Sequence, residues 1–132
     1  MPILSKDNKG AILGTAHLKT ESVDVPEWGE GVSVIVSEMS GLARDAFYAK
    51  KEAKKDMPIS ESQAALLVAT VVDESGAPVL DEADVESLRA QSTTALDRIV
   101  AVAVRINGLQ ANAADDAAKN SAAAPSGDSG SA

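Results

Sequence analysis

The segment from Thr94 to Ile106 constrains the fold more than any other part of the chain, because it is apolar on nearly every side. Only Asp97, Arg98 and Arg105 are clearly polar within it. A helix of this kind is either the central helix of a core or a core helix that also forms an interface. Asn107-Gly108-Leu109 marks its expected end, since glycine tolerates the left-handed conformation after a helix and the leucine can fold back onto it.

A β-hairpin is predicted before the helices. Valines alternate with polar residues on both sides of the turn Trp28-Gly29-Glu30-Gly31. Alternation on both sides of a Gly-containing turn is typical of a hairpin. Two strands alone are marginal in water, so this hairpin must pack on another element. Its inward-facing, structural side chains are expected to be Val23, Val25, Val34 and Val36.

Three further segments are predicted to be helical. Ser40 is a suitable N-cap for a helix that runs to about Asp56. Residues 60–63 (SESQ) have the pattern of a capping box, which favours a helix for the apolar run at 64–72. Asp81 caps a short helix with an acidic first turn, as the helix dipole favours. The apolar positions of the first of these helices are Met39, Leu42, Ala46, Ala49 and Ala53.

These segments predict an α+β fold, a mainly helical single domain with an N-terminal β-hairpin. Residues 1–17 lack sustained periodicity and are interpreted as a flexible arm, with one turn of helix near Leu13. The domain is expected to span residues 18–120 and to include a short polar helix at 112–119. Residues 121–132 contain only Ala, Ser, Gly, Pro and Asp, a composition typical of a disordered tail.

Composition excludes several classes of partner. Twenty acidic residues against twelve basic ones give a formal charge of −8, which repels phosphate backbones and anionic lipid. We therefore expect no nucleic acid and no membrane as partners. No apolar segment approaches the length of a spanning helix, and the N-terminus lacks the pattern of a signal peptide, so the protein is expected to stay where it is made.

Residues that carry catalysis are scarce. The absence of cysteine excludes thiol nucleophiles and thiolate metal sites. The single histidine, His17, has no evident partner in the irregular arm. The carboxylates from Asp73 to Glu86 do not follow EF-hand spacing, because Pro78 stands where that loop needs glycine. We expect no enzyme, no catalytic, cofactor-binding or metal site, and no cofactor.

Six stretches, in unbroken order, resemble the tail assembly chaperones of long-tailed bacteriophages. The likeness covers about residues 18–120, and this order is more specific than any single stretch. The stretches are LKTESVDVPEWG at 18–29, SEMSGLARDAF at 37–47, VVDESG at 71–76, DVESL at 84–88, ALDR at 95–98 and INGL at 106–109.

This resemblance implies a non-enzymatic assembly factor in the host bacterial cytoplasm. Members of the family coat the tape measure protein before the tail tube polymerises, then leave, and are not retained in the mature virion. The implied partners are the tape measure protein, the major tail (tube) protein and further copies of the chain, as a homo-oligomer. The family also implies a short form and a longer, frameshifted form. This chain resembles the short form, and its residues 118–120 (AKN) permit the slippery codons GCA AAA AAC.

Two groups of side chains are candidates for partner contact. One group consists of four lysines, which either receive an acidic partner or complement the C-terminal end of their own helix. The other group consists of apolar side chains. The candidates are Leu96, Ile99, Val100 and Ala103 on the apolar helix, and Lys50, Lys51, Lys54 and Lys55 along one side of the first long helix.

Two other functions remain open at this point. One is a structural phage component, such as a connector or tail-terminator subunit that stays in the virion. The other is an acidic regulatory protein that masks a basic partner, as an antitoxin does.

Overall fold

The computed structural model describes residues 2–109. The helix expected at 112–119, the tail at 121–132 and the codons for 118–120 therefore lie outside the described residues. The elements in chain order are α1 (Lys9–Leu13), β1 (Thr20–Asp24), the 3-10 turn η1 (Pro26–Trp28), β2 (Ser33–Ser37), α2 (Gly41–Ala53), α3 (Ile59–Thr70), β3 (Val71–Val72), the 3-10 turn η2 (Glu82–Asp84), α4 (Val85–Arg89) and α5 (Thr93–Ile106).

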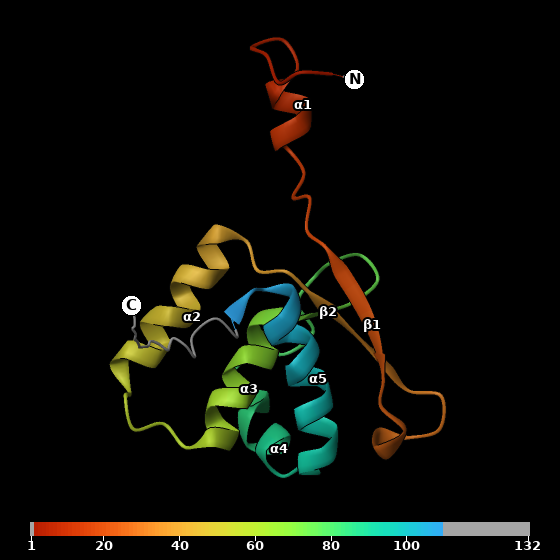
Figure 1. The fold of residues 1–132 in the computed structure, drawn as a ribbon, viewed down its shortest axis with the longest axis vertical. Helices are drawn as coiled ribbons and strands as arrows, with labels where there is room; N and C mark the ends of the chain where they lie inside the picture. Colours follow the sequence, from red (N-terminus) through yellow and green to blue (C-terminus); the bar gives the residue numbers. More distant parts are fainter. Residues whose placement is uncertain (1, 110–132) are drawn as a thin grey trace, which may run out of the picture.

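The body of the molecule is layered (Figure 1). The antiparallel sheet, in the order β1-β2-β3, forms one side. Helix α5 lies against β1 and β2 and also contacts α3, while α2 packs on the other side of α3. Helix α1 stands away from the body at the N-terminal end of the chain (Figure 1). The predicted α+β, mainly helical single domain is confirmed.

The hairpin is where the alternation of valines predicts it. Val23 lies opposite Val34, and both side chains are buried. Val25 and Val36, the other two predicted structural valines, have no exposed surface at all. The inner face of the sheet therefore belongs to the core, as expected for two strands that cannot be stable alone.

The third strand contradicts the prediction of an uninterrupted helix over 64–72. Helix α3 stops at Thr70, and the backbone of Val71 is extended. Val71 then pairs with Val36, and Val72 pairs with Ile35. Two adjacent β-branched residues next to a free strand edge favour sheet over helix, and the sequence pattern of a short apolar run does not distinguish the two.

Helix α5 is the centre of the core. Leu96, Ile99 and Ala103 are buried on the face that meets the sheet and α3. The predicted end of this helix is confirmed, because Gly108 has a φ of 65° and Leu109 packs against the buried core residues. The structure places this helix at the centre of the core, and a second role as an interface stays a prediction.

Polar groups at the edge of α5 hold the hairpin. Arg98 forms a bidentate pair with Glu27, with both N–O distances at 2.6 Å, and Arg105 pairs with Glu21 at 2.6 Å. The side chain of Asn107 accepts a 2.7 Å hydrogen bond from the backbone N–H of Met39 and donates one to the carbonyl of Ser37. Each contact joins residues more than 65 positions apart, so together they fix the hairpin across the end of the core.

Helix α2 begins as predicted, whereas α3 does not. The Ser40 hydroxyl accepts a hydrogen bond from the Ala43 N–H at 3.1 Å, which confirms the N-cap. Helix α3 starts directly after Pro58, so the capping box expected at 60–63 is wrong. Proline is favoured at a helix start, and the Ser60 hydroxyl instead accepts a hydrogen bond from Arg89.

The predicted apolar face of α2 is also wrong. Leu42 is exposed, and Phe47 is the residue of this helix that enters the core. The helix ends at Ala53, three residues before the expected Asp56. By contrast, the Asp81 cap is confirmed, because its carboxylate accepts a hydrogen bond from the Ala83 N–H.

The Arg98–Glu27 pair makes stability depend on pH. Hydrogen bonds from Arg98 lower the pKa of Glu27 from 4.5 to about 2. A carboxyl whose pKa is lower in the folded state stabilises it fully above about pH 4.5 and loses that contribution as the pH falls towards 2. We expect the free energy of unfolding to be smaller for Glu27→Gln than for the wild type at pH 7, and the difference to vanish across this acid range. Urea denaturation at a series of pH values measures it.

Glu30→Gln is the matched control, since Glu30 is exposed in the same hairpin and forms no ion pair with the described residues. Its difference from the wild type should be small throughout. A Glu27→Gln deficit that persisted unchanged at pH 2 would show that packing, not the ion pair, accounts for it.

Candidate partner-binding groove

An apolar groove of about 540 Å³ lies between α2, α3 and α5. Most of its walls are hydrocarbon, with polar groups at a few positions only. The apolar lining comprises Phe47, Tyr48, Met57, Ile59, Leu66, Val100, Val104 and Leu109, and the polar lining comprises Lys51, Ser62 and Gln63.

The groove arises from the way the helices are attached. Helices α2 and α5 both pack on α3, but they make little contact with each other. Phe47 anchors α2 to the core, and the rest of this helix is partly or fully exposed. The open space above α3 is therefore flanked by two helices and is not covered by a further element of residues 2–109.

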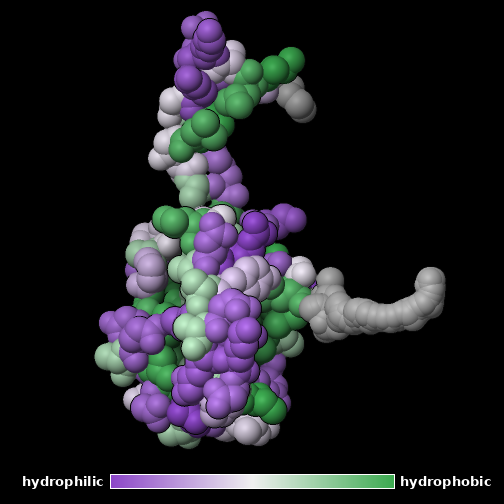
Figure 2. All heavy atoms as spheres, turned by 90° about the vertical axis from the view of Figure 1, so that its left-hand side faces the viewer, coloured by the Kyte–Doolittle hydropathy of each residue, from purple (hydrophilic) through white to green (hydrophobic). Residues whose placement is uncertain are grey.

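Exposed apolar side chains form the rim. Ile59, the first residue of α3, is 80% exposed, and Tyr48 is about half exposed. The Tyr48 ring lies 5.7 Å from the Phe47 ring, at an angle of 44°. Figure 2 faces α2 and shows a hydrophilic outer surface over this helix with hydrophobic surface beside it. Exposed apolar surface with a polar surround is typical of a binding site for another protein.

Among residues 2–109, Lys51 is the one charged side chain that lines the groove. Its Nζ atom lies 5.5 Å from the centre of the Phe47 ring, a cation–π contact that holds the ammonium group at the groove edge. Apolar walls with a single cation suit a helix that presents an apolar stripe with an acidic residue beside it.

The structure brings only two of the predicted partner-binding residues into this groove, Val100 and Lys51. Leu96, Ile99 and Ala103 are buried in the core, so their side chains cannot reach a partner in this conformation. The four candidates on the apolar helix are therefore divided, because Val100 faces the groove and the other three face inward.

The four lysines do not form one stripe. Helix α2 ends at Ala53, so Lys54 caps it and Lys55 follows it. Three of the lysines lie in ion pairs within the chain, and such exposed pairs contribute little to stability. The pairs are Lys50 with Glu82, Lys54 with Glu61 at 2.8 Å and Lys55 with Glu52 at 3.5 Å. Partner contact through these lysines stays a prediction.

Several rim residues are not apparent from the sequence as binding candidates. Ile59 follows Pro58 in what reads as a connection, and Leu109 reads only as part of a helix stop. Tyr48 lies in α2 and Met57 in the α2–α3 connection, and both come near Val104 only in the folded chain. In the sequence, only the size of these side chains could have marked them as binding candidates, because aromatic and large apolar residues are scarce around the polar segment that forms α2.

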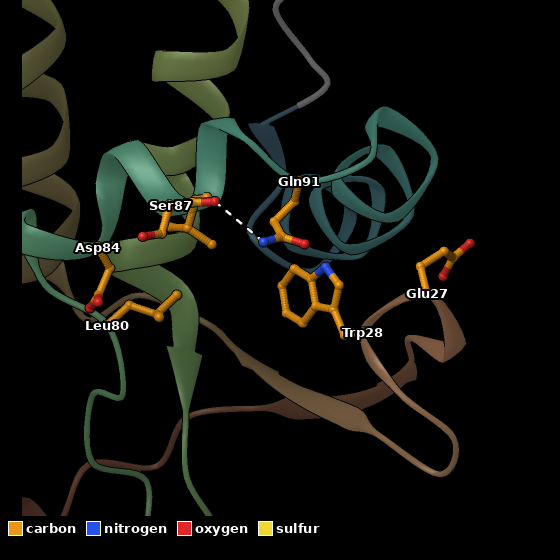
Figure 3. Close-up of a pocket in the computed structure, with 7 residues that line it drawn as sticks. Glu27, Trp28, Leu80, Asp84, Ser87 and Gln91 are labelled. Atoms are coloured by element: carbon orange, nitrogen blue, oxygen red, sulfur yellow. Dashed lines mark hydrogen bonds between the residues drawn. The ribbon is translucent and has the colours of Figure 1, made fainter.

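A second hollow, of about 440 Å³, lies under the tip of the hairpin (Figure 3). Trp28 enters it from η1, next to Gln91, whose amide donates to the Ser87 carbonyl at 3.4 Å. Within residues 2–109, the buried indole N–H of Trp28 has no hydrogen-bond partner. The nearby carboxylates are engaged elsewhere: Glu27 pairs with Arg98, and Asp84 accepts from the Asp81 N–H. This hollow therefore lies between the hairpin tip and α4. The two carboxylates among the described residues that line it, Glu27 and Asp84, are both held by hydrogen bonds within the chain.

Two further findings concern the described residues alone. Among residues 2–109, no three His, Cys, Asp or Glu side chains lie together in a way that could hold a metal ion. In the same part of the chain, no helix is long and apolar enough to cross a membrane.

The fold and the groove define a small α+β protein with an open apolar groove on its surface. A family model described as phage tail assembly chaperone matches residues 9–120, so the chain belongs to the phage tail assembly chaperone family. The match starts inside the N-terminal arm, nine residues before the resemblance apparent from the six sequence stretches.

A solved structure has the same fold. It is the structure of the bacteriophage HK97 tail assembly chaperone, which is 23% identical to this chain with a TM-score of 0.51. The alignment covers 76% of this chain and 94% of that one. A search of curated proteins finds no match.

The division of α5 into a core side and a groove side predicts different effects of arginine at adjacent positions. Ile99→Arg places an unpaired charge in the core and should lower the free energy of unfolding by about 3–5 kcal/mol. Val100→Arg can extend its guanidinium to the mouth of the groove and should cost about 1 kcal/mol. Thermal melting by circular dichroism measures both. Equal unfolding of the two variants would contradict the division of the helix.

Proposed function

We propose that this family member shields the tape measure protein during phage tail assembly, and that the groove between α2, α3 and α5 receives an apolar helical stripe of that protein. The observation that carries the proposal is an open apolar groove on a chain of the tail assembly chaperone family. A tape measure protein is a long helical rod with apolar faces, and such faces need cover until the tail tube surrounds them.

The groove supports this proposal through its chemistry. An amphipathic helix binds a groove by placing large apolar residues from successive turns against hydrocarbon walls. Val100, Val104 and Leu66 line the floor, while Ile59 and Tyr48 stand at the rim. Lys51 adds a cation at the edge, which favours a stripe flanked by an acidic residue.

The remaining parts of the proposal follow from the family. The protein acts without catalysis in the host bacterial cytoplasm, binds the major tail protein as well as the tape measure, and associates with further copies of itself. It leaves before the tail is complete. Membership of an assembly chaperone family favours this role over a connector subunit or an antitoxin-like regulator.

Two equally exposed residues on neighbouring helices test the groove. Ile59 is 80% exposed at the rim, and Leu42 is 83% exposed at the start of α2 and does not line the groove. Ile59→Glu places a carboxylate where the apolar stripe would sit, at a helix N-terminus that tolerates negative charge. We expect this variant to stay folded and to bind the tape measure protein about tenfold or more weakly, which corresponds to roughly 1.4 kcal/mol. Leu42→Glu should bind as the wild type does.

Co-expression with the tape measure protein provides the measurement. The soluble fraction of the tape measure should fall with Ile59→Glu and remain high with Leu42→Glu. If both variants kept the tape measure soluble, the groove would not be its binding site.

A further inference from the structure

The N-terminal arm, residues 2–19, carries apolar side chains that the body of the molecule does not cover. Ile3 is 84% exposed and Leu13 is 69% exposed, and no residue of α1 is buried. The arm projects away from the sheet and the other helices (Figure 1). In Figure 2 its surface is hydrophobic along one side and hydrophilic along the other. An amphipathic element in this position lacks a surface to pack on.

The arm nevertheless has its own local order. The Ser5 N–H donates to the Asn8 side chain at 2.7 Å, and the Asn8 N–H donates back to the Ser5 hydroxyl at 3.3 Å. At the other end of α1, the His17 ring donates from Nε2 to the Ile12 carbonyl at 2.7 Å. A five-residue helix is marginal in water by itself. These hydrogen bonds favour the helical conformation of α1, and packing against a surface would stabilise it further.

The base of the arm is fixed to the sheet. The Lys19 carbonyl accepts a 2.8 Å hydrogen bond from the Glu38 N–H, and the Lys19 N–H donates to the Glu38 carboxylate at 2.9 Å. These bonds continue the β1–β2 ladder by one residue. The arm therefore leaves along the direction of β1, and α1 is carried beyond its own body (Figure 1).

The outer face of the sheet offers a surface of matching character. Two adjoining hollows, each of about 410 Å³, share Ile35, Asp73 and Glu74 in their walls, and the base of the same copy's arm (Thr15, Ala16 and Leu18) lines one of them. We call them together the outer trough. Its floor contains the cross-strand pair Ile35 and Val72, and Val79, more than half exposed, lies beside them.

Charge favours the match between the arm and this trough. The projecting part of the arm, residues 2–17, holds two lysines and one aspartate, a formal charge of +1 in a chain whose total is −8. The trough is bordered by the carboxylates Asp73 and Glu74, and none of the residues from 2 to 109 that line it is basic. The groove between α2, α3 and α5 is a poorer match, because its charged lining residue is Lys51.

We infer that the arm of one copy docks in the outer trough of a second copy, with the apolar side of α1 on Ile35, Val72 and Val79 and its lysines facing Asp73 and Glu74. This inference deepens the self-association included in the proposed function and rests on it. The outer part of the arm, residues 2–13, does not line the trough of its own copy. The contact is therefore head-to-tail, and each copy in a growing assembly presents one free arm and one free trough.

Complementary variants test this contact in the full-length chain. Leu13→Glu disables the arm and leaves the trough intact, whereas Val79→Glu disables the trough and leaves the arm intact. Both positions are exposed, so the monomer should keep its circular dichroism spectrum. By light scattering, the wild type should exceed the monomer mass and each variant alone should be monomeric. Their equimolar mixture should form a dimer and no larger species, because only one arm and one trough remain functional.

A charge reversal provides a second test that does not depend on apolar packing. Lys9→Glu and Glu74→Lys should each weaken self-association, and a chain that carries both should recover it. Ile59→Glu is the control, since it alters the other groove and should leave the wild-type mass unchanged.

Three outcomes would overturn the inference. They are a monomeric wild type, in which the arm is free or folds onto its own trough, a monomeric mixture of the two complementary variants, and loss of self-association in Ile59→Glu. None of these measurements uses the tape measure protein. Failure of the groove to bind the tape measure would therefore leave a dimeric mixture intact, and the two proposals fail separately.

Discussion

The burial of α5 between the hairpin and α3 is the interaction on which the rest of the fold depends. Leu96, Ile99 and Ala103 fill the space between the sheet and α3. Apolar burial alone does not set the rotation of a helix, because it has no direction. The two arginine–glutamate pairs and the Asn107 side chain set it by tying one edge of α5 to the hairpin. One helix thereby organises segments from both ends of the described chain.

This arrangement also explains why a groove remains open. Because one side of α5 faces the sheet, the other side, which bears Val100 and Val104, faces away from the hairpin and lines the groove beside α3. Helix α2 is anchored on α3 through Phe47 and does not close over these valines. The apolar core is thus complete on one side and open on the other, which is the geometry that the proposed binding of a helical partner requires.

Much of this fold could be predicted from local sequence patterns. Alternating valines located the hairpin, and the serine and aspartate caps located the starts of α2 and η2, because each signal acts over a few residues. The errors have non-local causes. Val71 and Val72 form a strand because Ile35 and Val36 offer a free edge, and Leu42 is exposed because α2 turns Phe47 inward.

The candidate site was less accessible to sequence analysis. Its walls come from three helices, and only folding brings Tyr48, Ile59 and Val104 together. The sequence pattern suggests one basic stripe, yet Lys50 pairs with Glu82 and Lys54 with Glu61, carboxylates outside α2 that reach these lysines only in the folded chain. Val100 and Lys51 were the two candidates that the fold places in the groove.

Binding of an apolar helical partner in the groove between α2, α3 and α5 is what we propose for this chain. Hydrogen–deuterium exchange of the protein with and without the tape measure protein tests it most directly. The account predicts slower exchange in α2 around Tyr48, at the start of α3 and in the last turns of α5, with β1 and β2 unchanged by the tape measure. Slower exchange confined to the sheet, or none in the three helices, would contradict it.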